Sequence, residues 1–329
     1  MDNPQVTVLV AVWNTAEYLP QCLDSLRRQT LRDIQVVCVD DASTDKSLAV
    51  LRRYASTDKR IEVVALPRNH GQAHARNVAL RQAKGKYVCF LDSDDWMADD
   101  CLERAVDVFR AYPQTGCVLF HTLYYYSESR KEEFPMQPFR VLRGEQAFVL
   151  SLTWKIHGVY MVRADIQKRY TYDESSRAFS DDNTTRIHYL ASCEVRTCTG
   201  TYYYRQRPTS VSHQFGIRRF DYLLANESMK RQLVSLGVAQ ETLNLYENHR
   251  WLNVVDMYML WFIHKADLPI AERIQALTVI RDSWSSIEVC RLRPTLRRKF
   301  GYIPFAGHWK CFVIQEQVYF RLRRLLRRL

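Results

Sequence analysis

Short apolar segments alternate with segments of helical periodicity throughout residues 6–91, and few folds accommodate this alternation. The apolar segments span residues 6–12, 34–39, 61–66 and 87–91. Each is apolar almost throughout, which is typical of parallel strands whose two faces are covered by helices. We therefore expect an α/β fold with a Rossmann-like, mainly parallel sheet flanked by helices.

Carboxylates follow two of these predicted strands. Asp40 and Asp41 follow the second strand, and Asp92, Asp94 and Asp95 follow the fourth. The carboxyl ends of parallel strands meet at one edge of a sheet, where ligands bind, so the acids should cluster there. Clustered carboxylates repel one another and suit a hard divalent cation. The alternative is that Asp94 or Asp95 caps the following helix, which is expected over residues 99–110.

The turn after the third strand carries the opposite charge. It reads RNHGQAHARN over residues 68–77. Gly71 permits close backbone approach, the helix start offers free N–H groups, and Arg76 follows within the first turns, which together suit a phosphate or a nucleoside. The alternative is an ordinary turn in which Arg76 pairs with an acid of the rim.

The composition indicates an ordered protein with a basic tail. Hydrophobic residues make up 47% of the chain and charged residues 25%, which excludes a disordered chain. Nine cysteines without a Cys-x-x-Cys pair suit a reducing cytoplasm and argue against a disulfide framework or a zinc site. No signal peptide and no transmembrane segment are expected. Residues 291–329 carry eleven basic side chains against Glu316 alone, so they hold nearly all of the net charge of +11.

Taken together, the motifs resemble those of the family 2 inverting glycosyltransferases of the GT-A fold. The matching segments occur in the family's order, at residues 6–14 (VTVLVAVWN), 39–45 (VDDASTD), 68–77 and 90–96 (FLDSDDW). The family usually has proline where Val12 stands. The resemblance implies a nucleotide-sugar donor, expected to be a UDP-sugar, with Mn²⁺ or Mg²⁺ as cofactor.

The resemblance also implies roles for the rim residues. Asp41 would contact the nucleobase with Asp40 beside it, and Arg76 would lie near the diphosphate. Asp92 would face the ribose or the donor sugar, and Asp94 would ligate the metal, which leaves Asp95 as the helix cap. The rest of the expected nucleotide-sugar site is Val12, Asn14, Asn69, Gly71 and Ser93.

Residues 179–183 (FSDDN) resemble the family's Glu-Asp segment. An inverting transfer needs a base that deprotonates the acceptor opposite the leaving group. Asp182 aligns with that base, and Asp181 replaces the usual Glu. The alternative is that both acids cap the helix expected over residues 184–191, and the two roles can coexist.

Two further roles in the site concern the second metal ligand and the cation that serves the leaving diphosphate. In many GT-A enzymes a histidine completes the metal shell, and His213 is the candidate here. Relatives often carry a lysine near Val159, which is missing, so either Lys155 or His157 could serve the leaving diphosphate.

We expect a catalytic domain over residues 1–215, with a nucleotide-sugar half (1–110) and an acceptor half (111–215), followed by a helical region over 216–329. The last helix has one apolar face among many arginines, which suits the anionic inner face of the cell membrane. Its alternatives are docking onto the body and nucleic-acid binding, of which the latter is least favoured. The apolar face comprises Val318, Leu322, Leu325, Leu326 and Leu329.

The predicted activity is metal-dependent transfer of one sugar per encounter to a glycan or lipid-linked acceptor. The Gln-x-x-Arg-Trp motif of processive family members is absent. Two rival classes share parts of this pattern. A nucleotidyltransferase of sugar phosphates would need a Gly-rich loop, and residues 6–14 contain no glycine. A non-catalytic sugar- or membrane-binding relative would keep the fold and dispense with the base.

Overall fold

The computed structural model describes residues 4–176, 179–207 and 216–326. The chain forms two compact units. The first comprises Met1–Glu174 and Thr184–His213, and the second comprises Ser175–Asn183 and Gln214–Leu329. The expected boundary between residues 215 and 216 lies close to the last crossing between the units, whereas the grouping of Ser175–Asn183 with the second unit was not anticipated.

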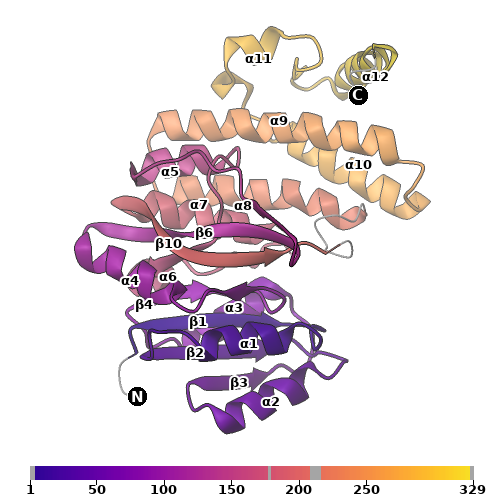
Figure 1. Ribbon diagram of the computed structural model, residues 1–329. Coiled ribbons are helices and arrows are strands. Elements are labelled where there is room, and N and C mark those ends of the chain that lie inside the picture. Colours follow the sequence, from indigo (N-terminus) through magenta and orange to yellow (C-terminus); the bar gives the residue numbers. More distant parts are fainter. Residues whose placement is uncertain (1–3, 177–178, 208–215, 327–329) are drawn as a thin grey trace. The chain divides into compact units, whose positions relative to one another are not determined.

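The first unit is built on one mixed sheet with the strand order β3-β2-β1-β4-β9-β6-β10-β5 (Figure 1). Strands β1 to β4 run parallel, β9 is antiparallel to both of its neighbours, and β10 is parallel to β6. The mainly parallel sheet that the sequence predicted is therefore confirmed. The strands are β1 (Val6–Val12), β2 (Ile34–Asp40), β3 (Ile61–Ala65), β4 (Tyr87–Phe90), β5 (Trp96–Met97), β6 (Thr115–Ser127), β7 (Arg130–Glu133), β8 (Val141–Arg143), β9 (Tyr160–Arg163) and β10 (Glu194–Arg205).

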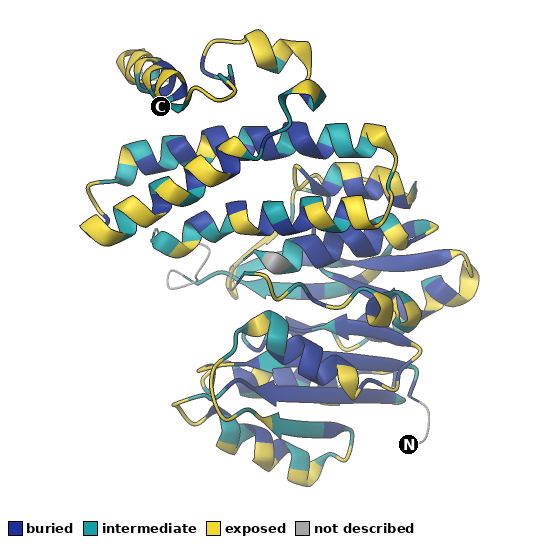
Figure 2. Ribbon diagram, turned by 180° about the vertical axis from the view of Figure 1, so that it is seen from behind, coloured by how far each residue is buried: buried dark blue, intermediate teal, exposed yellow. Residues whose placement is uncertain are grey.

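Helices cover both faces of the parallel half. Helices α1 (Leu19–Arg27), α2 (Ser47–Thr57) and α4 (Cys101–Ala111) pack on one face. Helix α3 (Gln72–Arg81) packs on the other, where it meets Val37 of β2. Every residue of β2 is consequently buried, and the strands of this half are largely dark blue in Figure 2.

The later part of the first unit extends the sheet. Strand β6 extends to Ser127, and its end pairs with the charged strand β7 in a hairpin. Helices α5 (Gly144–Ser151) and α6 (Ala164–Arg169) follow. Helix α7 (Ser180–Ala191) begins earlier than the helix predicted over residues 184–191, so Asp181 and Asp182 lie in its first turn.

The second unit is helical, as predicted for the C-terminal region. Aromatic side chains dominate its core, among them Trp251, Tyr258, Phe312 and Phe320. No helix in the described part of the chain is long and apolar enough to span a membrane. The remaining helices are α8 (Asp221–Ser235), α9 (Gln240–His264), α10 (Ile270–Ser285), α11 (Pro294–Arg298) and α12 (Trp309–Leu325), with 3₁₀ turns at Ile217–Phe220 and Val289–Arg291.

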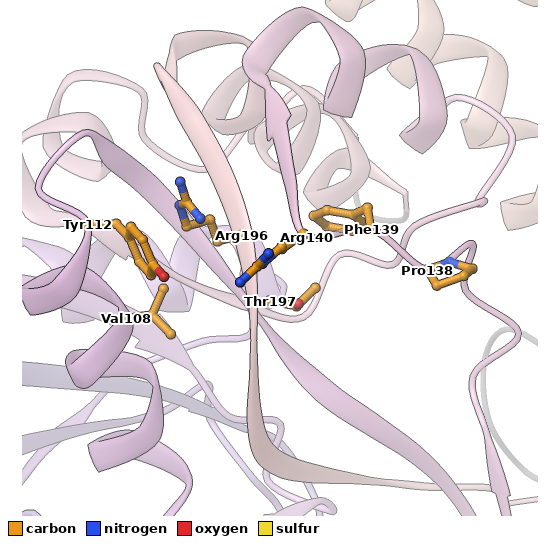
Figure 3. A pocket seen from close by; sticks show the side chains of 7 residues that line it. All are labelled: Val108, Tyr112, Pro138, Phe139, Arg140, Arg196 and Thr197. Carbon is orange, nitrogen blue, oxygen red and sulfur yellow. The ribbon is translucent and has the colours of Figure 1, made fainter.

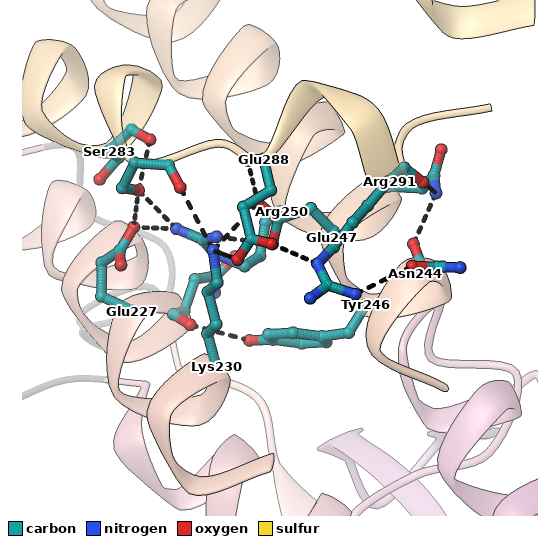
Figure 4. A network of polar contacts seen from close by, with 12 residues as sticks. Glu227, Lys230, Asn244, Tyr246, Glu247, Arg250, Ser283, Glu288 and Arg291 are labelled. Atoms are coloured by element: carbon teal, nitrogen blue, oxygen red, sulfur yellow. Dashed lines mark hydrogen bonds and ion pairs between the residues drawn. The ribbon is translucent and has the colours of Figure 1, made fainter. Parts of the chain in front are cut away.

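Buried charges connect the helices of this unit (Figure 4). The Arg250 guanidinium, which is 2% exposed, donates to Glu247 at 2.7 Å and pairs with Glu227. The Lys230 ammonium lies 3.2 Å from Glu247 and 2.7 Å from Glu288. Each charge of this network thus has a partner of opposite sign, which offsets the cost of removing it from water.

Candidate active site

The carboxyl ends of β1, β2 and β4 bring the predicted acids to one rim of the first unit. Val12 and Asp40 are neighbours in the register of β1 and β2, and the Asp41 N–H donates to the Val12 carbonyl at 2.8 Å. After β4, the Asp95 N–H donates to the Asp92 carbonyl at 2.9 Å, which closes residues 92–95 into a tight turn. The acids therefore extend from the ends of β2 and β4, the two strands that flank β1 in the sheet.

Asp41 holds the turn that starts α3. Its Oδ1 accepts the His70 N–H at 2.8 Å and its Oδ2 accepts the Gly71 N–H at 2.7 Å. The Asn69 amide donates to the Asp41 carbonyl at 3.2 Å. Gly71 has a φ of +95°, a conformation that favours glycine. The start of α3 is thereby fixed beside the ends of β1 and β2.

Arg76 reaches the rim from the buried side of α3. It is 1% exposed, and its guanidinium lies 4.1 Å from the centre of the Phe90 ring. Its Nη2 donates to Asp92 Oδ1 at 2.6 Å, and the Gln72 side chain donates to the same oxygen at 2.9 Å. The structure therefore shows the ion pair between Arg76 and a rim acid that the sequence left as an alternative.

Asn14, Thr15 and Ser93 connect neighbouring strand ends at this rim. Asn14 Oδ1 accepts the Thr44 N–H at 2.8 Å, and Asn14 itself has a φ of +51°. The Thr15 hydroxyl donates to Ser93 Oγ at 2.9 Å. These bonds cross from β1 to the segments after β2 and β4, so the predicted residues Asn14 and Ser93 lie together.

Asp94 is a partly buried acid of the turn after β4. It forms an ion pair with Arg207, two residues after the end of β10. Its pKa is raised, first because burial removes water from the carboxylate and second because Asp92 carries a like charge, whereas Arg207 lowers it. A desolvated carboxylate that lacks full compensation fits a hard divalent cation such as Mg²⁺ or Mn²⁺.

Asp94 alone does not make a complete metal site. In the described part of the chain, no group of three or more His, Cys, Asp or Glu side chains could hold a metal ion. Water and donor oxygens would have to supply the other ligands. The second predicted ligand, His213, lies outside the described residues.

The prediction that Asp95 caps α4 is wrong. Helix α4 begins only at Cys101, after strand β5, and its N-cap residue is Asp100. Asp95 is buried and accepts the Tyr202 hydroxyl and the Arg205 N–H, each at 2.8 Å. Burial, followed by the charges of Asp94 and Asp92, raises its pKa well above the usual range. Asp95 therefore anchors β10 to the acidic turn.

Residues 202–207 support the site, a role that the sequence did not assign to them. The Tyr202 hydroxyl also accepts the Asp92 N–H at 3.2 Å. Arg205 Nε donates to the Asp94 carbonyl at 2.8 Å, with its guanidinium 4.6 Å from the Trp96 ring centre. The only signal was the tyrosine- and arginine-rich string YYYRQR. Nothing in it indicates that β10 lies antiparallel to β5.

His157 is not a cation that could serve the leaving diphosphate. It is buried, and burial lowers its pKa to about 4. Its Nδ1 accepts the Val159 N–H at 3.2 Å, and its Nε2 lies 3.2 Å from the Thr122 hydroxyl. A neutral imidazole is the form that fits this environment. Of the two candidates, Lys155 is the exposed one.

Asp181 and Asp182 belong to the second unit and lie in the first turn of α7. The Asp182 N–H donates to Asp181 Oδ1 at 3.2 Å. Acids in this position are favourable because they face the positive end of the helix dipole. Both acids thus lie at the start of a helix, as the alternative interpretation of the sequence proposed. The role of Asp182 as base stays a prediction.

A mainly parallel α/β sheet with acids after two strand ends and a buried arginine from the intervening helix defines the class of GT-A glycosyltransferases. Residues 7–170 match the family model described as Glycosyl transferase family 2, and the chain belongs to this family. The resemblance noted in the sequence and the transferase class that it implied are therefore confirmed.

Relatives in sequence bear glycosyltransferase names. An uncharacterized glycosyltransferase of Haemophilus influenzae is 38% identical over 107 residues, which are 32% of this chain and 43% of the relative. The uncharacterized glycosyltransferase EpsJ of Bacillus subtilis is 28% identical over 222 residues, which are 64% of this chain and 63% of EpsJ. The matches thus span less than two thirds of these relatives.

Solved structures confirm the fold over nearly the whole chain. The 1–349 fragment of S. aureus TarS in complex with UDP-GlcNAc has a TM-score of 0.77 at 19% identity, and the match covers 96% of this chain and 92% of that one. The mannosyltransferase PcManGT of Pyrobaculum calidifontis, in complex with GDP-Man and Mn²⁺, has a TM-score of 0.54 at 21% identity and covers 96% and 86%. At these identities the likeness concerns the fold.

Proposed function

We propose that the protein transfers a sugar from a UDP-sugar to a hydroxyl group of a glycan or lipid-linked acceptor, with inversion and one sugar per encounter. The observation that carries the proposal is the rim, where Asp41 follows β2, Asp92 and Asp94 follow β4, and Arg76 of α3 pairs with Asp92. The structural neighbours were solved with UDP-GlcNAc or with GDP-Man and Mn²⁺, which supports a nucleotide-sugar donor and a divalent cation.

The donor would lie along this rim. The nucleoside would sit by Asp41 and the turn that Asp41 holds. The first turn of α3 offers backbone N–H groups to the diphosphate, and Arg76 adds a fixed positive charge next to Asp92. Because Arg76 is buried and held over Phe90, it needs little reorganisation when the donor binds.

Asp94 would hold the cation together with donor oxygens and water. When bound, Mn²⁺ or Mg²⁺ supplies Lewis-acid chemistry that neutralises charge on the departing diphosphate. Asp95, Tyr202 and Arg205 would keep the acidic turn in place while Asp94 exchanges its partner.

Asp182 would accept the proton of the acceptor hydroxyl as that oxygen attacks the anomeric carbon. Inversion follows because the attack and the departure of the diphosphate occur on opposite faces of the sugar ring. Asp181 Oδ1 holds the Asp182 backbone N–H, which orients the start of α7. This assignment rests on the family resemblance of the segment.

The test is a panel of nucleotide-sugars with Mn²⁺ or Mg²⁺, in which nucleotide release is followed. We expect Asp94→Ala and Asp182→Ala each to lower kcat by about 100-fold or more, in line with the loss of a base or of charge stabilisation. Asp107→Ala on the exposed face of α4 is the control and should leave kcat unchanged. Absence of turnover with every donor, or full activity in both variants, would contradict the proposal.

We further propose that the protein works at the inner face of the cell membrane. On α12, apolar side chains at helical spacing are strongly exposed: Val318 by 44%, Leu322 by 46% and Leu325 by 80%. The opposite face docks within the second unit through Phe312 and Phe320. The helix therefore docks on the body through a face other than the predicted apolar one, which stays available for lipid.

Charge around this stripe supports an anionic surface. Arg321 and Arg324 are exposed beside Leu322 and Leu325. A helix with exposed leucines flanked by arginines suits the interface of an anionic bilayer, where each basic side chain adds about 1 kcal/mol of binding free energy. A lipid-linked acceptor would reside at the same interface.

A further inference from the structure

The first unit contains a hollow of ≈ 430 Å³ that does not belong to the rim (Figure 3). Arg196 in this hollow precedes Tyr202, which binds Asp95, by six positions along β10. In the register of β10 with β6, the two positions lie opposite Val118 and Thr122, so at about 3.3 Å per residue of β6 they are roughly 13 Å apart along the strand. The hollow is lined by Val108, Tyr112, Pro138, Phe139, Arg140, Arg196 and Thr197.

Strand pairing brings the arginines of the hollow together. In the antiparallel register of β8 and β10, Val141 lies opposite Arg196, so Arg140 lies next to Arg196 although they are far apart in the sequence. The end of α4 supplies Tyr112 to the same place. Figure 3 shows the Arg140 and Arg196 side chains, from different segments, bordering one hollow.

Arg196 is held in a fixed orientation. Its Nε donates to Glu194 Oε2 at 2.9 Å, and its guanidinium lies 3.8 Å from the centre of the Tyr112 ring. Glu194 takes up donors on one edge of the guanidinium, and the tyrosine covers one face. Within the described part of the chain no partner is recorded for Nη1, so Nη1 can donate to a ligand.

Arg140 supplies the charge that is not compensated. It is exposed, and in the described segments it has no ion-pair partner. The two guanidinium groups of the hollow face one carboxylate, that of Glu194, so the hollow carries a net positive charge. Guanidinium groups recognise carboxylates and phosphates through paired hydrogen bonds.

The remaining lining is aromatic and aliphatic. Tyr112, 42% exposed, and Phe139 present ring surface to the hollow, and Val108 and Pro138 add aliphatic contact. An inorganic anion would bind the two arginines and leave the aromatic and aliphatic lining in contact with water. An apolar ligand would cover that lining and leave the positive charge of the arginines unpaired. A sugar ring offers an apolar C–H face and a polar rim, and an acid group on it satisfies both kinds of lining.

We propose that this hollow binds an acidic saccharide residue, a uronate or a phosphorylated sugar, with its acid group on Arg140 and Arg196 and its ring against Tyr112 and Phe139. The proposal rests on the proposed function, because it makes the hollow a second contact for an acidic acceptor glycan. Such a contact would hold the chain at a distance from the rim and raise the effective concentration of its reacting end.

The experiment is isothermal titration calorimetry on the full chain with tetragalacturonate, glucose 6-phosphate, maltotetraose and inorganic phosphate. We expect at least one of the two acidic saccharides to bind about tenfold more tightly than both maltotetraose and inorganic phosphate. Arg140→Gln should weaken that binding by about tenfold, the value of one charge-assisted hydrogen bond. Tyr112→Ala should weaken it as well, because the ring contact is lost.

Controls separate this site from the donor site. Arg52→Gln, which removes an exposed arginine of α2, should leave saccharide binding unchanged. UDP binding should be the same in the wild type and in Arg140→Gln. Equal affinity for maltotetraose or for phosphate, absence of binding, or unchanged binding in both hollow variants overturns the proposal. Wild-type protein that binds the acidic saccharide but neither binds nor turns over a nucleotide-sugar would contradict the proposed function instead.

Discussion

The Asp94 carboxylate pairs with the Arg207 guanidinium and is also the proposed ligand of a divalent ion. Its ion pair with Arg207 compensates part of a charge that burial and Asp92 make unfavourable. A divalent ion bound to the same carboxylate would be repelled by the guanidinium at a separation of a few ångströms. If Asp94 binds a divalent ion as proposed, Arg207 would have to move away from Asp94 or would weaken the binding of that ion.

Replacing Arg207 tests this competition. Arg207→Gln should raise the affinity for Mn²⁺ by about fivefold in the absence of donor, because a partly exposed charge pair near the surface is worth about 1 kcal/mol. Free Mn²⁺ can be quantified by electron paramagnetic resonance. Arg110→Gln, an exposed arginine of α4 whose partner is Asp107, is the matched control. Equal or weaker Mn²⁺ binding in Arg207→Gln would show that the arginine does not compete.

Asp94 and Asp95 also mark the limit of what the sequence could predict at this scale. The cluster of acids at a strand end was evident, and so was its need for compensation. Adjacent side chains of this turn point in different directions, so one of the two acids faces the protein interior. Only the position of Tyr202 and Arg205, more than a hundred residues later, decides that it is Asp95.

At the scale of elements, the packing of α7 on β9 depends on a neutral histidine. His188 Nδ1 accepts the Tyr160 hydroxyl at 2.6 Å, and Nε2–H donates to the Tyr170 carbonyl at 2.7 Å. Burial lowers the pKa of His188 to about 4. Protonation would place a second N–H against the tyrosine hydroxyl, so the folded state resists it.

This burial predicts acid sensitivity. The unfolded chain binds a proton on His188 below pH 6.5 and the folded chain only below about pH 4, so the free energy of unfolding falls as pH falls through this range. The loss reaches about 3 kcal/mol near pH 4, at 1.36 kcal/mol per pKa unit. Urea unfolding between pH 7 and pH 4 measures it.

A variant assigns the effect to this residue. His188→Gln should reduce the pH dependence of the unfolding free energy, whereas His264→Gln, in the exposed last turn of α9, should not. His157, whose pKa is also lowered to about 4, will maintain part of the dependence. An unchanged slope in His188→Gln would show that the histidine is protonated without cost in the folded state.

The charge network of α8 and α9 gives a second prediction for these elements. Glu247→Ala leaves the buried Arg250 and the Lys230 ammonium without a carboxylate on which both depend. Removing one member of a buried pair costs about 3–5 kcal/mol of unfolding free energy. Glu241→Ala, exposed in the first turn of the same helix, should cost less than about 1 kcal/mol. Chemical denaturation compares the two, and similar losses would mean that the network contributes little.

For the whole molecule, the sequence predicted the parallel half of the sheet better than the remainder. Apolar strands and amphipathic helices alternate there, and the consecutive strands β1, β2 and β3 are neighbours in the sheet, whereas β4 returns to pair with β1. Strand β9 lies between β4 and β6 and is antiparallel to both, an arrangement set by contacts between distant segments that periodicity cannot report. The same long-range pairing creates the hollow at Arg140 and Arg196.

The exposed apolar face of α12 is the surface through which we propose that the protein binds the membrane. Replacing Leu322 and Leu325 together by Glu should abolish most binding to vesicles that contain anionic lipid, because apolar burial is lost and the added charges are repelled. Sedimentation with vesicles of phosphatidylglycerol and phosphatidylcholine measures this, and salt should weaken wild-type binding. Ile274→Glu, at an apolar position of α10 that is 62% exposed, is the control and should bind like the wild type. Equal sedimentation of the wild type and the double variant would rule out α12 as the membrane contact, since Phe312 and Phe320 keep the helix docked in either case.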